Sequence, residues 1–157
     1  MRARLSLYLA RIEFCLYEIS LRDKPEHMLK VSPKGTVPVL ILGDNQIIDE
    51  SLDIMIWAFS QQGIMDKYLP QDKKKSSLSL INTNDTSFKK NLDSYKYSSD
   101  DRKKEGAFQK CLDFVSELDL LLETNEYLLD DSPLMVDYAI FPFIRQFINV
   151  DEQRFKD

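Results

Sequence analysis

Residues 31–51 decide the fold and read Val-Ser-Pro-Lys-Gly-Thr-Val-Pro-Val-Leu-Ile-Leu-Gly-Asp-Asn-Gln-Ile-Ile-Asp-Glu-Ser. Pro33 and Gly35 mark a loop at the start of this stretch. The apolar run 37–42 is rich in β-branched residues and is typical of a buried strand. Gly-Asp-Asn at 43–45 is turn chemistry, because small polar residues tolerate left-handed backbone angles. The four residues after the turn therefore predict the returning strand of a β-hairpin.

A helix is predicted directly after the hairpin. Ser51 is expected to cap it, and its apolar residues run from Leu52 to Phe59. Pro38 stands at the start of the first strand, where a proline is tolerated because the first amide need not join the ladder. Two alternatives remain for the bond between Val37 and Pro38. It is either an ordinary trans bond or a cis bond that leaves the Val37 N–H and C=O free for a ligand.

The composition is that of an ordinary globular protein. The chain has 157 residues, of which 43% are hydrophobic and 30% charged, and its formal net charge is −5. This mildly acidic balance argues against nucleic acid as the main partner. No apolar run approaches the roughly 20 residues that span a bilayer, so we expect no membrane partner. Cys15 and Cys111 lie far apart and His27 is the only histidine, which predicts no metal site and a cytoplasmic protein with reduced thiols.

The chain before the hairpin alternates between helix and strand. Residues 2–11 fit a short helix, although their leucines also alternate as in a strand. Residues 13–21 are rich in Phe, Leu, Tyr and Ile and predict a strand. Residues 22–30 are polar and predict a helix, with Pro25 suited to its first turn. This order of elements is typical of an α/β fold.

After the hairpin domain the chain becomes all-helical. Residues 63–75 contain a glycine, a proline and three consecutive lysines, and they predict a linker. The expected organisation is an α/β domain over 1–62, this linker, and a helical domain over 76–157. Within the last, a helix is predicted from about residue 101 to about 122, where apolar residues recur at helical spacing.

Four side chains could be taken for a nucleophile. We interpret Cys111, and also Cys15 in its predicted strand, as small buried hydrophobes, because apolar surroundings raise the pKa of a thiol. A reactive thiol remains the alternative at Cys15. Ser6 and Tyr8 lie on a predicted helix without a visible base, and an activated nucleophile needs such a partner.

A family resemblance rests on two motifs of the opening stretch. Ser-Pro-Lys-Gly-Thr-Val-Pro-Val-Leu from residue 32, followed by Asp-Glu-Ser at 49–51, resembles the glutathione-binding half of the glutathione transferases. The closest resemblance is to cysteine-type, omega-like bacterial members. It implies a thioredoxin-like N-terminal domain followed by an all-helical C-terminal domain. It further implies a homodimer, glutathione as co-substrate without a metal, and an unknown electrophile or disulfide as second substrate.

The resemblance implies four glutathione-binding residues. Lys24 would hold the glycyl carboxylate, and Val37 would pair with the cysteinyl part through its N–H and C=O. Glu50 would take the γ-glutamyl ammonium. Ser51 and the free amides of the helix start would take the α-carboxylate. The same resemblance favours the cis bond before Pro38. Without it, the lysine could be an ordinary surface residue, the glutamate a helix-dipole partner and the serine a cap.

The family's helical half also has a counterpart in this chain. Residues 132–143 resemble its core helix, in which a Ser or Thr stands three residues before the Asp that Asp137 matches. Here Leu134 takes that place and cannot cap. We therefore predict that Ser132 caps instead, with Pro133 at the first helical position.

The resemblance also implies a missing part. Family members begin with a strand and a loop that carries the catalytic residue, and Met-Arg-Ala-Arg-Leu at 1–5 resembles a run inside the helix that follows. The catalytic position is therefore expected to precede Met1, and no catalytic residue is assigned. Two classes of function remain: a transferase that conjugates glutathione or exchanges thiols and disulfides, or a non-catalytic glutathione-fold module or incomplete chain. For the chain as written we expect little or no transferase activity, because the strand between 14–21 and 37–42 would be absent and no activating residue would lie beside the glutathione sulfur.

Overall fold

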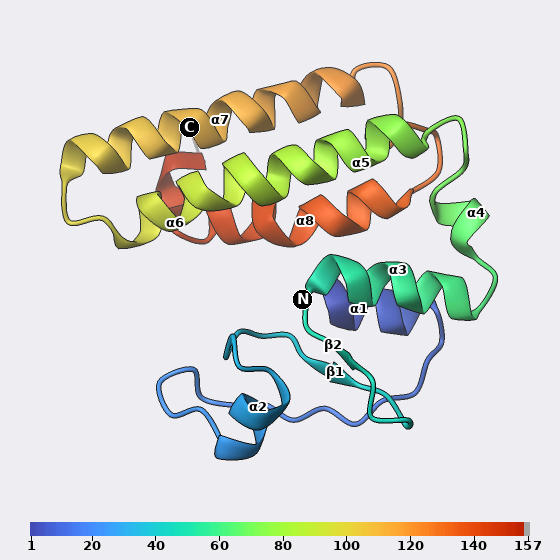
Figure 1. Ribbon diagram of the computed structural model, residues 1–157. Coiled ribbons are helices and arrows are strands. Elements are labelled where there is room, and N and C mark those ends of the chain that lie inside the picture. Colours follow the sequence, from blue (N-terminus) through green and yellow to red (C-terminus); the bar gives the residue numbers. More distant parts are fainter. Residues whose placement is uncertain (156–157) are drawn as a thin grey trace. The chain divides into compact units, whose positions relative to one another are not determined.

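The computed structural model describes residues 1–155 and divides into two compact units (Figure 1). The first unit is Met1–Met65, and the second begins at Asp66. The first contains helices and a small hairpin, whereas the second is helical, so the predicted order of an α/β part followed by an all-α part is confirmed. The division falls inside the predicted linker 63–75. The last two residues of the predicted helical domain, 156–157, lie outside the described residues.

The first unit is built on two helices that pack against each other. Helix α1 (Arg2–Leu9) contacts α3 (Ser51–Gln61), and Figure 1 shows the two side by side. The helical interpretation of residues 2–11 is therefore confirmed over the alternating one. The two helices bury apolar side chains of different sizes, which are Ala3, Leu7, Ile54, Met55, Ala58 and Phe59. Their removal from water supplies most of the stability of such a pair.

The hairpin before α3 is present as predicted. Strands β1 (Leu40–Ile41) and β2 (Ile47–Ile48) are antiparallel and form a two-stranded sheet. The paired residues are Leu40 with Ile48 and Ile41 with Ile47. In the turn, Asn45 has a φ of 62° and its N–H donates to the carbonyl of Leu42 at 2.9 Å. The left-handed conformation is one that asparagine tolerates better than most residues.

The predicted strand at 13–21 is wrong. Within residues 1–155 this segment joins no sheet, and its only strand-like pairing is an isolated bridge between Ser20 and Asp23. Apart from the half-buried Ile19, its residues are exposed, and Tyr17 is 84% exposed. Cys15 is exposed as well, so its interpretation as a buried hydrophobe is also wrong. Composition favours an extended chain, but a strand forms only where a neighbour accepts its backbone hydrogen bonds.

A short helix connects this segment to the hairpin. Helix α2 (Glu26–Val31) has Pro25 at its N-cap position rather than inside its first turn. The next correction concerns α3, which begins at Ser51 with Glu50 as its N-cap residue. The expectation that Ser51 caps this helix is therefore wrong. The backbone of Glu50 is extended, so Ser51 is the first helical residue. The side-chain oxygen of Ser51 accepts a hydrogen bond from Arg2 instead of capping the helix.

The second unit is formed by helices in succession. Its elements, with α4 at the division between the units, are α4 (Met65–Tyr68), α5 (Lys74–Thr83), the π-helical turn η1 (Asn84–Phe88), α6 (Lys89–Tyr97), α7 (Asp101–Leu122), α8 (Met135–Ile148) and the 3-10 turn η2 (Glu152–Phe155). Helix α6 packs on α7, and α5 packs on α8 (Figure 1). At the start of α7 the carboxylate of Asp100 accepts from the N–H groups of Arg102 and Lys103, at 2.9 and 3.2 Å. This is a regular N-cap.

Aromatic rings fill the core of the second unit. The ring of Phe147 on α8 lies 5.1–5.8 Å, centroid to centroid, from those of Phe88, Tyr95, Phe108 and Phe155. Three of these pairs are edge-to-face, an arrangement that aromatic rings prefer, and the fourth, with Phe108, is tilted. Cys111 on α7 is buried beside them, and burial raises its pKa to about 12. The prediction that Cys111 is a core residue is confirmed.

The start of α8 differs from the prediction. The helix begins at Met135 with Leu134 at the N-cap position, so Ser132 does not cap it. The carboxylate of Asp137 accepts from the N–H of Leu134 at 2.8 Å and from that of Leu128 at 2.9 Å. Burial raises the pKa of Asp137, against the effect of these two bonds. The aspartate thus satisfies the helix start and the preceding loop from inside the helix, and no serine cap is required.

Candidate functional site

The sequence motifs that carry the family resemblance meet at one end of the first unit. The loop 32–35 leads into β1, and β2 leads through Asp49 and Glu50 into α3. Gly35 turns the loop with a φ of +59°. A Cβ atom at Gly35 would lie 3.1 Å from Cδ2 of Leu29 and 3.4 Å from Nζ of Lys24. The Lys24 side chain therefore lies against this loop, although it is exposed to solvent.

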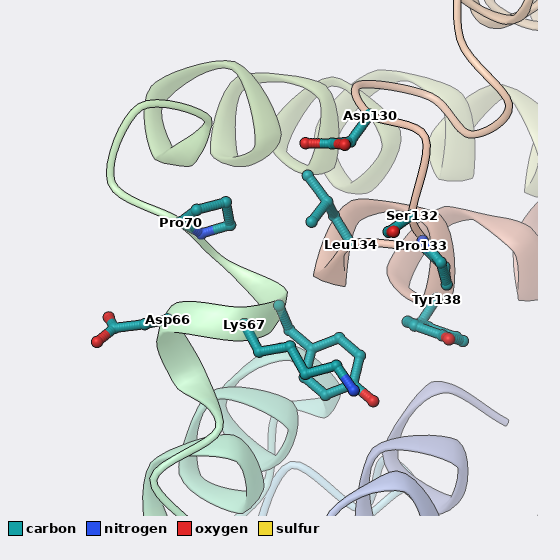
Figure 2. A pocket seen from close by; sticks show the side chains of 9 residues that line it. Asp66, Lys67, Pro70, Asp130, Ser132, Pro133, Leu134 and Tyr138 are labelled. Carbon is teal, nitrogen blue, oxygen red and sulfur yellow. The ribbon is translucent and has the colours of Figure 1, made fainter.

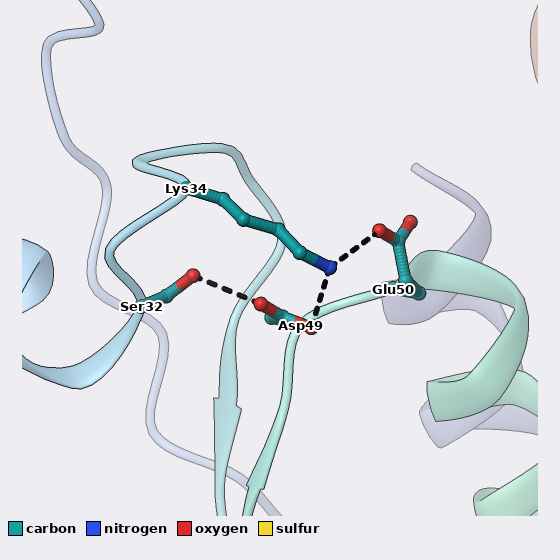
Figure 3. Close-up of polar contacts among 4 residues, drawn as sticks. All are labelled: Ser32, Lys34, Asp49 and Glu50. Carbon is teal, nitrogen blue, oxygen red and sulfur yellow. Dashed lines mark hydrogen bonds and ion pairs between the residues drawn. The ribbon is translucent and has the colours of Figure 1, made fainter.

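Four polar side chains connect the loop to the start of α3 (Figure 3). The ammonium of Lys34 donates to Glu50 Oε1 at 3.0 Å and to Asp49 Oδ1 at 3.3 Å. The hydroxyl of Ser32 donates to Asp49 Oδ2 at 3.1 Å. Hydrogen bonds to Glu50 and then to Asp49 raise the pKa of Lys34. Bonds from Lys34 and then from Ser32 lower the pKa of Asp49. Both groups are therefore charged at neutral pH.

Val37 presents its backbone at the surface. The bond between Val37 and Pro38 is cis, which confirms the prediction. The residue is 49% exposed, and among the described residues its N–H and C=O have no hydrogen-bond partner. The Glu50 side chain is held by Lys34 and remains exposed. Of the four expected site residues, Glu50 and Ser51 are thus adjacent at the start of α3, and Lys24 lies against the loop that precedes Val37.

Ser51 has a buried cationic neighbour. Arg2 on α1 is only 2% exposed, and its Nη1 donates to Ser51 Oγ at 3.4 Å. A guanidinium can only donate hydrogen bonds, so the serine oxygen is the acceptor. The hydroxyl proton of Ser51 must then point in another direction.

Sequence reasoning missed four residues of this region, which are Arg2, Ser32, Lys34 and Asp49. Lys34 and Asp49 stand inside the quoted motifs, and their opposite charges on the two sides of a predicted hairpin were a usable signal. Arg2 gave no such signal, because arginines are rarely buried and its helix contains a second arginine, Arg4.

The candidate nucleophiles differ in their surroundings. Ser6 is buried and donates to the carbonyl of Ala3 at 2.8 Å, whereas Tyr8 is exposed. At neutral pH the raised pKa keeps Cys111 protonated. Cys15 is the exposed thiol of the described chain. Residues 1–155 hold no group of three or more His, Cys, Asp or Glu side chains that could bind a metal ion. They also contain no helix long and apolar enough to span a bilayer.

The second unit contains a cavity of about 500 Å³ that the sequence did not predict (Figure 2). It is lined by Asp66, Lys67, Tyr68, Pro70, Asp130, Ser132, Pro133, Leu134 and Tyr138. The rings of Tyr68 and Tyr138 meet edge to face at 5.8 Å. Burial, together with the nearby Tyr68, raises the pKa of Tyr138. At neutral pH this side chain is therefore a phenol that can exchange hydrogen bonds, and it cannot act as a phenolate base.

Comparison with known proteins connects the first unit to one family. Residues 1–72 match the family described as glutathione S-transferase, N-terminal domain. No curated protein sequence matches the chain significantly.

Solved structures extend the similarity over nearly the whole chain. BphK, a bacterial glutathione transferase solved as a ternary complex, is 21% identical with a TM-score of 0.85, covering 96% of this chain and 78% of that chain. A sphingomonad glutathione S-transferase complexed with glutathione is 18% identical with a TM-score of 0.82, over 96% and 78%. A Pseudomonas fluorescens family member with two glutathione molecules bound is 17% identical with a TM-score of 0.82, over 98% and 75%.

These similarities agree with the elements seen here, which are a hairpin and two packed helices followed by a helical unit. At such identities the solved structures establish the fold, and the family match applies to residues 1–72. Residues 1–72 therefore belong to the family of glutathione S-transferase N-terminal domains, and the chain has the fold of the solved glutathione transferases.

Proposed function

We propose that this protein binds glutathione through Lys24, Val37, Glu50 and Ser51 and acts as a glutathione transferase. The reaction is either conjugation of glutathione to an electrophile or thiol–disulfide exchange, carried out by a cytoplasmic homodimer, as the family resemblance implies. The observation that carries the proposal is the exposed and unpaired backbone of Val37 on the segment that matches the family. Related structures that contain glutathione support it.

Each residue supplies a different part of such a site. The N–H and C=O of Val37 can pair with the main chain of a tripeptide in the manner of an added strand. The exposed carboxylate of Glu50 suits the γ-glutamyl ammonium. The hydroxyl proton of Ser51, which cannot point at Arg2, suits the α-carboxylate at the start of α3. The ammonium of Lys24 suits the glycyl carboxylate.

A second candidate is a glutathione-binding module without catalysis. It is favoured by the state of the candidate nucleophiles, since the Ser6 hydroxyl is bonded to a backbone carbonyl and the Cys111 thiol is buried. A thiolate is the nucleophilic form of a thiol, and burial suppresses it.

Calorimetric titration tests the binding step. Glutathione should bind the wild type, and Glu50→Gln should weaken binding about tenfold or more, because a charge-assisted hydrogen bond is lost. Glu117→Gln, at another exposed glutamate on α7, should leave affinity unchanged. A wild type that does not bind glutathione would sink the proposal. Turnover of chlorodinitrobenzene or of a glutathione mixed disulfide then supports the enzyme, whereas binding without turnover supports the binding module.

A further inference from the structure

Lys34 lies where the proposed site would meet the γ-glutamyl end of a ligand (Figure 3). An ammonium group has three N–H donors. Two of those of Lys34 are used by Glu50 Oε1 and Asp49 Oδ1. Among the residues that the structure describes, the third donor has no acceptor, and Glu50 Oε2 has no donor. A free donor on a cation thus stands next to a free acceptor on an anion.

We propose that Lys34 and Glu50 together bind the α-amino-acid head group of the ligand, with the ligand carboxylate on Lys34 and its ammonium on Glu50. This inference rests on the proposed function and deepens it. It adds Lys34 as a further binding residue at the γ-glutamyl end of the proposed site.

Lys34 could instead only occupy Glu50 and keep the ligand away from it. The way in which Lys34 is held in place favours its role as a binding residue. Lys34 is held by two carboxylates, and Asp49 is itself held by the hydroxyl of Ser32, which is buried. When Glu50 turns one oxygen to a ligand ammonium, the bond to Asp49 still keeps the lysine in place. The raised pKa of Lys34 keeps it charged in the empty site.

The local charges also fit a zwitterion. Lys34, Asp49 and Glu50 carry a net charge of −1. A ligand with one ammonium and one carboxylate places a positive group beside Glu50 and a negative group beside Lys34, and it leaves this net charge unchanged. Without the lysine, two adjacent carboxylates would face the ligand carboxylate and repel it. The hydroxyl of Ser51, on the residue after Glu50, offers a second donor to the same carboxylate, because its oxygen is engaged by Arg2.

The test is to titrate the protein with three ligands. Binding is measured from the NMR chemical shifts of the ligand, which can determine dissociation constants in the millimolar range. The ligands are glutathione, glutaryl-cysteinyl-glycine without the α-amine, and 4-aminobutyryl-cysteinyl-glycine without the α-carboxylate. Lys34→Met should weaken binding of the first two about tenfold. It should change binding of the third less than about twofold. Lys34→Arg, which keeps the charge, should stay within about threefold for all three.

Lys30→Met is the matched control, because Lys30 is an exposed lysine on α2 that pairs with Glu26 away from the proposed site. It should leave all three affinities unchanged. Tighter binding of glutathione by Lys34→Met would show that the lysine competes with the ligand, and would overturn the proposal. Equal losses for all three ligands, or none, would also overturn it. A wild type that binds no glutathione refutes the proposed function itself, which distinguishes the two failures.

Discussion

The two units cover their apolar side chains to different degrees. In the first unit, the segment before α2 and the hairpin leave large apolar side chains in solvent, namely Phe14, Leu16, Tyr17, Leu21, Val37, Ile41 and Ile47. In the second unit, rings from η1, α6, α7, α8 and η2 contact one another around Phe147, which is fully buried. The first unit thus carries the proposed ligand surface, and the second carries the denser core.

This difference has a simple physical origin. Helices satisfy their own backbone, so the second unit needs only side-chain packing to close its core. The first unit contains extended segments, and extended backbone needs a neighbour for its hydrogen bonds. Where such a neighbour is absent within the described residues, as at 13–18, the residues are exposed to solvent.

The two cysteines give the largest expected contrast, because one lies in each unit. Iodoacetamide at pH 8 should modify Cys15 and leave Cys111 unmodified, with rates that differ about a thousandfold or more. With a pKa of about 12, Cys111 is ionised in about one molecule in ten thousand at pH 8. Its rate should rise tenfold for each pH unit in the native protein, because the thiolate is the reactive form. Mass spectrometry of digested peptides over time measures both rates.

The same experiment in denaturant is the control, since both thiols are then exposed and should react at similar rates. Rapid native modification of Cys111 would mean that the second unit opens readily. The contrast drawn between the two units would then be wrong.

The aromatic core gives the next largest effect. Phe147→Ala should lower the free energy of unfolding by about 3–5 kcal/mol, because a large buried side chain is lost and a cavity remains. Phe141→Ala is the matched control, since Phe141 lies on the same helix and is 56% exposed. Its effect should stay below about 1 kcal/mol. Urea denaturation followed by circular dichroism measures both. Similar losses at the two positions would remove the distinction between core and surface on α8.

Much of the fold could be predicted from the sequence because most elements carry local signals. The turn at 43–45, the spacing of apolar residues on α7 and the proline after residue 24 depend on neighbours in the sequence. The strand at 13–21 could not be judged in this way, because pairing depends on distant backbone. Leu134 was misjudged for a related reason, since Asp137 satisfies the helix start without a cap side chain.

Less of the candidate site could be predicted. Lys24, Val37, Glu50 and Ser51 came from the resemblance, and the structure adds where they lie. The contacts of Lys34 with two carboxylates could not be read from spacing alone, because 15 and 16 residues separate the partners and a hairpin brings them together. The burial of Arg2 followed only from the packing of α1 on α3.

The smallest expected effect concerns Gly35, which tests whether the loop of the proposed site is a fixed part of the first unit. Gly35→Ala should cost about 1 kcal/mol, because a left-handed alanine costs about 1–2 kcal/mol and the loss of unfolded-state entropy returns part of it. Gly35 lies on the loop that carries Lys34, and its new Cβ would also lie 3.1 Å from Cδ2 of Leu29 on α2, so that one of the two must shift. Glutathione affinity should therefore fall with stability. Gly63→Ala shares the positive φ but meets no atom within 4 Å among the described residues, and Gly43→Ala shares neither feature. Urea midpoints and glutathione titrations of the three variants separate strain from crowding. If Gly35→Ala matched Gly43→Ala in both measurements, the loop would not be the fixed part of the site that its contacts indicate.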